Sequence, residues 1–161
     1  MFGIDFLVFF SHTVVDSIFK KSSPFLSQFF VKENTTNLRV RYGETDQMGV
    51  VYYGNYAQFL EQGRTEWLRE LGFSYKWMEE NNVLLPVTNL NIDFKLPAHY
   101  DDVISITTKL KKIPTFKIEF DYQIHNQNGD LLVSASTTLV FINATTNKLM
   151  RAPDYLLERL T

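Results

Sequence analysis

The sequence predicts a single α+β domain in which one antiparallel sheet covers one long helix. Residues 54–71 carry apolar side chains at the i, i+3, i+4, i+7 spacing of an amphipathic helix. One strand-like segment precedes this helix, and four segments rich in β-branched and aromatic residues follow it. A chain of 161 residues with 45% apolar content can bury one sizeable hydrophobic core but is too short to form two such cores comfortably.

The first half of the domain is expected to hold one strand and two helices. The strand is expected at residues 38–42, where apolar and polar residues alternate, and a turn-rich loop follows over residues 43–51. Gly72 is placed to end the long helix, and a short helix is expected at about residues 74–81. The apolar stripe of the long helix consists of Tyr56, Phe59, Leu60, Gly63, Trp67 and Leu71.

The second half is expected to hold four strands and a last helical turn after Pro153. The strands are expected at about residues 83–96, 102–112, 115–126 and 131–143. The Asn126–Asp130 segment supplies turn residues and suggests an antiparallel hairpin. Residues 131–142 are more continuously apolar than the other strands and suit a central or interface position. The helix stripe has no other surface to bury against, so the sheet should wrap around it.

Residues 1–36 differ in composition and are expected to form an apolar, helical extension, with the domain at 37–161. They hold eight of the fourteen phenylalanines, and residues 2–10 are too short to span a bilayer. Amphipathic helices at about residues 3–20 and 24–32 are the simplest expectation. They could pack on the domain, on a partner subunit or, through residues 1–32, on a membrane surface. A start codon assigned too far upstream is an equal alternative.

Composition excludes several kinds of function. A net charge of −2 without a basic stripe argues against nucleic-acid binding. The absence of cysteine excludes thiolate nucleophiles, disulfides and cysteine-based zinc sites, and fits a cytoplasmic protein. The histidines His12, His99 and His125 lie in three different predicted elements, so no metal site is expected, and His99 is expected at the surface.

Residues 41–56 form the segment with the richest chemistry, RYGETDQMGVVYYGNY. It places Asp46 in a loop a few residues before the start of the long helix. A helix start presents unpaired N–H groups and the positive end of the helix dipole, which can stabilise negative charge on a carbonyl oxygen. A nearby carboxylate could attack that carbonyl or activate water to do so. A cap or turn role for Asp46 is the alternative from these features alone.

This segment resembles the signature of the 4-hydroxybenzoyl-CoA thioesterase-type hotdog family, including its YbgC-like acyl-CoA thioesterases. In that family an Asp-Thr-Asp-x-x-Gly-x-Val-Tyr run precedes a Tyr-bearing helix that carries Glu-x-x-Arg. The resemblance covers about residues 38–153, because the segments 85–87, 92–98, 100–102, 128–129 and 135–141 also match in order. It implies a hotdog fold that hydrolyses acyl-CoA to a free acid and coenzyme A. It also implies no cofactor or metal, and a homodimer or a dimer of dimers (a homotetramer) with sites at the dimer interface.

Carried over to this chain, the resemblance implies a role for Asp46 as nucleophile or as general base for water. The backbone N–H of Tyr53 takes the place of the donor that polarises the thioester carbonyl. Two positions differ from the family: Glu44 replaces its first Asp, and Tyr53 replaces the His common in YbgC-like members. The substrate is expected against the neighbouring residues Gly49, Val50, Val51, Tyr52, Asn55 and Tyr56.

Other charged residues have two interpretations each. Glu61 and Arg64 lie three residues apart on the helix and could pair with one another, or line the site. Glu61 is the second candidate for the catalytic carboxylate, because another hotdog branch uses a helix carboxylate. The lysines near one predicted turn could meet the phosphates of coenzyme A, or form a solvated charged face. These lysines are Lys111, Lys112 and Lys117.

Two other functions stay open. A hotdog hydratase or dehydratase usually needs a histidine beside a carboxylate, and the predicted helix has none. A non-catalytic protein that binds acyl thioesters is the other alternative. Fatty, hydroxybenzoyl-like and dihydroxynaphthoyl-like acyl groups all fit the sequence.

Overall fold

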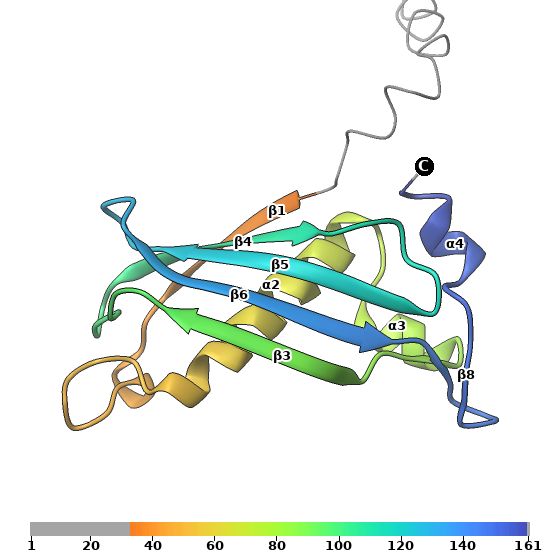
Figure 1. Ribbon diagram of the computed structural model, residues 1–161, viewed down its shortest axis with the longest axis horizontal. Coiled ribbons are helices and arrows are strands. Elements are labelled where there is room, and N and C mark those ends of the chain that lie inside the picture. The colour runs from red at the N-terminus through yellow and green to blue at the C-terminus, as the bar shows by residue number, and fades with distance from the viewer. Residues whose placement is uncertain (1–32, 161) are drawn as a thin grey trace, which may run out of the picture. The chain divides into compact units, whose positions relative to one another are not determined.

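The computed structural model describes residues 33–160, and the helices expected at 3–20 and 24–32 lie outside them. A five-stranded antiparallel sheet curves around one long helix (Figure 1). The helix is α2 (Tyr56–Glu70), and the short η3 (Tyr53–Asn55) leads directly into it. In order across the sheet, the strands are β1 (Glu33–Arg39), β4 (Val103–Leu110), β5 (Lys117–His125), β6 (Leu131–Val140) and β3 (Val87–Phe94). This is the hotdog fold that the sequence predicts.

The remaining elements are a small second sheet and several short helices. A second sheet of order β2-β7-β8 lies at the end of the molecule where α3 and α4 are found (Figure 1). Its strands are β2 (Val83–Leu84), β7 (Ile142–Asn143) and β8 (Lys148–Leu149). The remaining short helices are η2 (Tyr42–Glu44), α3 (Tyr75–Glu80) and α4 (Asp154–Leu157). No helix within residues 33–160 is long and apolar enough to cross a membrane.

The apolar stripe of α2 is buried against the sheet, which confirms its prediction. Leu60 and Trp67 are fully buried, and the Trp67 ring meets Phe120 of β5 edge to face with 5.0 Å between ring centres. A Cβ atom at Gly63 would lie 2.5 Å from Oγ1 of Thr108 on β4. Glycine at position 63 therefore lets the helix approach the sheet closely.

The helix ends where the sequence predicts. Gly72 has φ +92°, a left-handed conformation that favours glycine. Its N–H donates to the carbonyl of Arg69 (2.9 Å), and the N–H of Phe73 donates to that of Leu68 (3.0 Å). Ser74 then caps α3, because its hydroxyl accepts the N–H of Trp77 at 3.1 Å. These bonds satisfy carbonyl and N–H groups that helix ends leave unpaired.

Several strand limits differ from the prediction. The first strand was expected at 38–42, but β1 begins at Glu33 and ends at Arg39. The sequence of β1, ENTTNLR, is mainly polar, so its pairing with β4 and not an apolar pattern makes it a strand. The strand expected at 83–96 divides into β2 and β3 around Pro86, which has no N–H to donate to a sheet. The strand expected at 131–143 divides at Phe141 into β6 and β7.

The hairpin expected at residues 126–130 is confirmed. It joins β5 to β6, which pair antiparallel. The side chain of Asn126 accepts the N–H groups of Asn128 (3.0 Å) and Asp130 (2.9 Å), and Gly129 has φ +85°. β6 lies between β5 and β3, the central position that its apolar sequence predicts.

Candidate active site

The loop that carries Asp46 folds back on itself between η2 and η3. The N–H of Asp46 donates to the carbonyl of Val50 (2.9 Å), and the N–H of Gly49 donates to the carbonyl of Asp46 (3.0 Å). Gly49 has φ +76°, so the turn needs a residue tolerant of the left-handed region. Oδ1 of Asp46 accepts the N–H of Met48 at 2.8 Å, while Oδ2 has no hydrogen-bond partner among residues 33–160. Oδ1 thus stabilises the turn, and Oδ2 is left without a hydrogen bond to these residues.

A second loop, residues 97–102, holds the first one in place. The N–H of Val51 donates to the carbonyl of Ala98 at 2.8 Å, and Val50 pairs with His99 in an isolated bridge. His99 itself is exposed, as predicted, with 59% of its side chain accessible.

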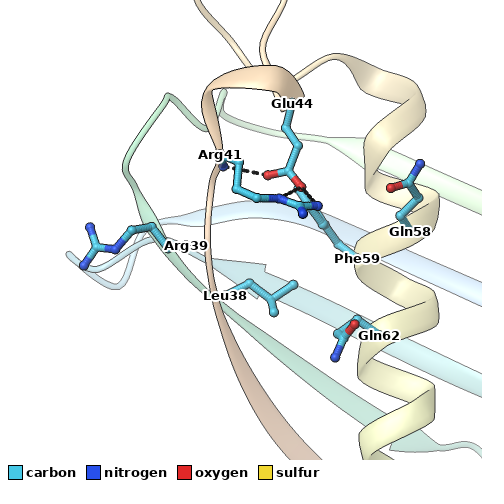
Figure 2. Close-up of a pocket in the computed structure, with 7 residues that line it drawn as sticks. All are labelled: Leu38, Arg39, Arg41, Glu44, Gln58, Phe59 and Gln62. Atoms are coloured by element: carbon cyan, nitrogen blue, oxygen red, sulfur yellow. Dashed lines mark hydrogen bonds and ion pairs between the residues drawn. The ribbon is translucent and has the colours of Figure 1, made fainter.

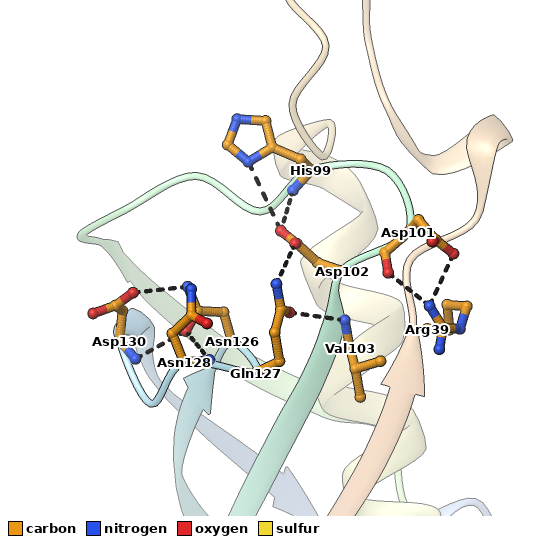
Figure 3. A network of polar contacts seen from close by, with 9 residues as sticks. All are labelled: Arg39, His99, Asp101, Asp102, Val103, Asn126, Gln127, Asn128 and Asp130. Atoms are coloured by element: carbon orange, nitrogen blue, oxygen red, sulfur yellow. Dashed lines mark hydrogen bonds and ion pairs between the residues drawn. The ribbon is translucent and has the colours of Figure 1, made fainter.

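Figure 3 shows the polar network that fixes this second loop. Asp102 accepts the N–H of His99 (2.7 Å) and Nε2 of Gln127 (2.9 Å), and Oε1 of Gln127 accepts the N–H of Val103 (3.0 Å). Burial alone would raise the pKa of Asp102, but the hydrogen bonds from Gln127 and His99 outweigh it and hold that pKa below its usual value. The carboxylate of Asp102 therefore acts as a structural anchor.

The start of the long helix offers a free donor beside the Asp46 loop. Tyr53 is the first residue of η3, and its N–H has no acceptor within the described part of the chain. The ring of Tyr53 is 65% exposed and lies against that of Tyr52. The N–H of Tyr53 thus lies at the positive end of the helix dipole without a partner.

A mainly apolar hollow of about 270 Å³ lies between the loop, the helix start and the end of β3. It is lined by Val50, Val51, Tyr53, Tyr56, Phe94, Lys95, Leu96 and Pro97. Tyr56 is buried, and its ring meets Phe94 edge to face at 5.3 Å between ring centres. Burial raises the pKa of Tyr56, against the opposing effect of a hydrogen bond from the backbone of Ala98, so its phenol stays neutral near pH 7.

The structure brings together part of the predicted site. Val50, Val51, Tyr53 and Tyr56 line the hollow, and Gly49 shapes the loop. Asn55 uses its side-chain amide inside the protein, where Nδ2 donates to the carbonyl of Glu44 at 2.8 Å. Phe94 at the end of β3, with Lys95 and Leu96 directly after it, were missed as site residues because they lie about fifty positions from Asp46 in the sequence. These residues lie within segment 92–98, and the resemblance of that segment to the thioesterase family could have indicated them.

Glu61 and Arg64 do not pair with one another. Glu61 is exposed on α2, whereas Arg64 is buried and lies away from the hollow. Nε of Arg64 donates to the hydroxyl of Tyr75, and Nη1 donates to that of Tyr122, both at 3.4 Å. Burial raises the pKa of Tyr122 to about 12. Arg64 thus connects α2, α3 and β5 within the core.

The three lysines lie at the opposite end of the sheet from Asp46, around the turn between β4 and β5 (Figure 1). Each one is paired with a carboxylate: Lys111 with Asp121 (3.0 Å), and Lys112 and Lys117 with Glu119 (2.8 and 3.0 Å). Hydrogen bonds from Lys112 and Lys117 lower the pKa of Glu119. Within one protomer, this arrangement favours the solvated charged face over a phosphate site.

A second hollow of about 330 Å³ lies on the β1 side of the Asp46 loop (Figure 2). It is lined by Leu38, Arg39, Arg41, Glu44, Gln58, Phe59 and Gln62. Its charged pair is Arg41 with Glu44, and the hydrogen bond to Glu44 raises the pKa of Arg41. Within residues 33–160, no group of three or more His, Cys, Asp or Glu side chains is placed to hold a metal ion.

Comparison with known proteins finds one family and close relatives within it. The pattern of the thioesterase-like superfamily matches residues 40–160. The YneP protein of Bacillus subtilis is 40% identical over 106 residues, which cover 66% of this chain and 77% of YneP. The acyl-CoA thioester hydrolase YbgC of Escherichia coli O6:H1 is 32% identical over 106 residues, or 66% of this chain and 79% of YbgC. The solved DHNA-CoA thioesterase of Staphylococcus aureus superposes with a TM-score of 0.71 at 37% identity, over 74% of this chain and 80% of that one.

Proposed function

This chain belongs to the thioesterase-like superfamily, and from that membership we propose that it hydrolyses acyl-CoA thioesters with the carboxylate of Asp46. The products are a free acid and coenzyme A. Coenzyme A is part of the substrate, and the reaction needs only water besides. The N–H of Tyr53 is the proposed donor to the thioester carbonyl oxygen.

The observation that carries this proposal is that one segment, residues 46–53, holds a carboxylate and a helix-start donor and forms part of the wall of an apolar hollow. Asp46 has a carboxylate oxygen without a hydrogen bond, and Tyr53 has an N–H without an acceptor, each among residues 33–160. Val50, Val51 and Tyr53 line the hollow, whose mainly apolar walls suit an acyl group, and Asp46 is not among its lining residues. A carboxylate, a helix-start donor and an apolar pocket are the parts that thioester hydrolysis without a metal requires.

In the proposed reaction the helix start stabilises the negative charge that develops on the carbonyl oxygen. Asp46 then acts in one of two ways. Its Oδ2 attacks the carbonyl carbon, the C–S bond breaks, coenzyme A leaves as a thiolate, and water hydrolyses the resulting anhydride. Alternatively, Oδ2 takes a proton from a water molecule that attacks the same carbon. A single turnover in ¹⁸O-labelled water tests the first route, because label found in Asp46 requires the anhydride.

We further propose that two copies associate along β3. β3 is an edge strand with one neighbour, β6, and its apolar side chains Val87, Leu90 and Phe94 are 46%, 43% and 51% exposed. A long apolar edge strand is prone to pair with another strand. Because Phe94 also lines the hollow, a partner on β3 would border the site.

Sedimentation equilibrium tests this association. The wild type is expected to form dimers, or pairs of dimers, and Leu90→Lys is expected to weaken them strongly. Asn37→Lys, on the other edge strand β1, is the matched control and should sediment as the wild type does. A monomeric wild type at micromolar concentration would contradict the proposal.

Release of free thiol from short, long and aromatic acyl-CoAs tests the activity and the role of Asp46 together. The wild type is expected to turn over at least one class. Asp46→Asn should lower kcat by about 10²–10⁴-fold, the usual contribution of a general base. Asp101→Asn is the control, because Asp101 is an exposed carboxylate whose one ion pair is with Arg39.

Three other results would contradict the proposed mechanism or the proposed function. Wild-type turnover that survives in Asp46→Asn would contradict the mechanism. Hydration of an enoyl-CoA without thiol release would identify a hydratase. Binding of acyl-CoA with neither reaction would identify a non-catalytic acyl-thioester-binding protein.

A further inference from the structure

We propose that Glu44 and Asn55 are positioning residues that set the separation between the Asp46 carboxylate and the N–H of Tyr53. Glu44 lies immediately before the Asp46 loop, and Asn55 lies at the start of α2. This inference rests on the proposed function and assigns Asn55 a role other than substrate contact.

The carbonyl oxygen of Glu44 joins the two ends of the loop. It accepts the N–H of Tyr52 at 2.9 Å and Nδ2 of Asn55 at 2.8 Å. These two donors flank Tyr53, one on each side in the sequence. Asp46 follows Glu44 by two residues. A shift of the helix start relative to the loop would therefore break both hydrogen bonds at once.

Glu44 is itself held firmly. The residue is 8% exposed, and its carboxylate accepts three N–H groups from Arg41: the backbone N–H at 2.7 Å, Nε at 2.9 Å and Nη2 at 2.6 Å (Figure 2). Bonds between ionised groups are short and strong. The carbonyl oxygen that receives Tyr52 and Asn55 thus belongs to a residue with little freedom to move.

The side chain of Asn55 does not cap the helix. Asn55 is the N-cap residue of α2, where an asparagine normally accepts an N–H of the first helical turn, but its side chain makes no such bond. Instead its amide donates to Glu44. One of the two N–H groups of Nδ2 is thus used in a link between the helix start and the loop.

Such a link matters for the reaction rate. A displacement of about 1 Å between reacting groups can lower a rate by about 10²-fold. Loss of the link should therefore lower kcat and leave KM nearly unchanged, because the apolar walls of the hollow are not altered. A residue that bound the substrate would instead raise KM.

The test compares Asn55→Ala with Asn34→Ala. Nδ2 of Asn34 donates to Oε2 of Glu70 at the same 2.8 Å, from β1 to the far end of α2, and its Oδ1 accepts the hydroxyl of Thr36 at 3.0 Å, so the control loses bonds of the same kind away from the site. Asn55→Ala is expected to lower kcat by about 10–100-fold with KM within about threefold, and Asn34→Ala to change neither. Asn55→Asp should lose at least as much, because its oxygen would face the Glu44 carbonyl.

Hydrogen exchange of the Tyr52 amide provides a readout independent of activity. It should become faster in Asn55→Ala and in Glu44→Gln, and stay unchanged in Asn34→Ala. Unchanged kcat and unchanged exchange in Asn55→Ala would overturn the proposal, as would a rise in KM alone. If Asp46→Asn kept the wild-type kcat, the proposed mechanism would fail, and exchange at Tyr52 would still decide whether the link exists.

Discussion

Both ends of the sheet carry charged residues. The lysines at one end are paired with carboxylates, whereas Asp46 at the other end is not in an ion pair among residues 33–160. At the turn between β4 and β5, each of three lysines lies within 3.0 Å of a carboxylate. At the other end, Asp46 has no ion-pair partner among residues 33–160, and one of its oxygens faces no donor there. A carboxylate oxygen and an N–H without partners, in a segment that lines an apolar hollow, indicate chemistry, whereas a cluster of fully paired charges indicates a solvated surface.

Matched glycine substitutions provide the strongest contrast between the active loop and an ordinary turn. Gly49 and Gly129 both have positive φ, and a Cβ atom at either meets nothing within 4 Å, so alanine adds only backbone strain. Both variants should lose about 1–2 kcal/mol of stability. Gly49→Ala should also lower kcat about tenfold, because it disturbs the turn that holds Asp46.

Urea denaturation and steady-state kinetics on both glycine variants check this expectation. Equal kcat values in the two variants would mean that the loop conformation does not matter to the reaction.

The second contrast concerns two carboxylates whose pKa values are lowered for different reasons. For Asp102, burial opposes the lowering but hydrogen bonds from Gln127 and His99 prevail, while Glu119 is stabilised by Lys112 and Lys117. A group with a lowered pKa in the folded state adds stability above its unfolded pKa, which is about 3.9 for Asp and about 4.3 for Glu. That stability is lost as pH falls through the folded-state value.

The free energy of unfolding of wild type minus that of Asp102→Asn should therefore be largest near neutral pH and shrink below about pH 4. Added salt should reduce the corresponding difference for Glu119→Gln more than that for Asp102→Asn, because salt screens ion pairs and Glu119 is paired with two lysines. Urea titrations at several pH values and two salt concentrations measure both. A difference for Asp102→Asn that does not vary with pH would contradict the assignment.

The smallest effects are expected from the lysines. Lys112→Gln and Lys117→Gln should change kcat and KM by less than about twofold, because their charges are already paired on the surface. A tenfold rise in KM for acyl-CoA would show instead that these lysines meet the phosphates of the substrate.

The sequence predicted the elements whose pattern is local. The stripe from Tyr56 to Leu71, the helix end at Gly72 and the hairpin at 126–130 each follow from spacing or turn residues within a short window. The position of Asp46 before a helix start follows from the same kind of signal.

Features that depend on distant contacts were not predicted. Most of β1 is polar and is held as a strand by pairing with β4, about seventy residues away, so only residues 38 and 39 of it fall within the strand predicted at 38–42. Arg64 was expected to pair with Glu61 or to line the site, but it is buried in the core, where it donates to the hydroxyls of Tyr75 and Tyr122. The wall of the hollow formed by Phe94 also depends on how β3 meets the helix start.

The central claim is that the N–H of Tyr53 polarises the thioester carbonyl for Asp46, and Tyr53→Pro tests it by removing that N–H together with the ring. Proline suits the first position of a helix, and Tyr52, with φ −57° and ψ 130°, already has the conformation that proline requires before it. Tyr53→Ala is the control, because it loses the exposed ring and keeps the N–H. The account predicts that kcat for acyl-CoA hydrolysis falls by about 10²–10³-fold in Tyr53→Pro and stays within about fivefold of wild type in Tyr53→Ala. Equal kcat values in the two variants would contradict it.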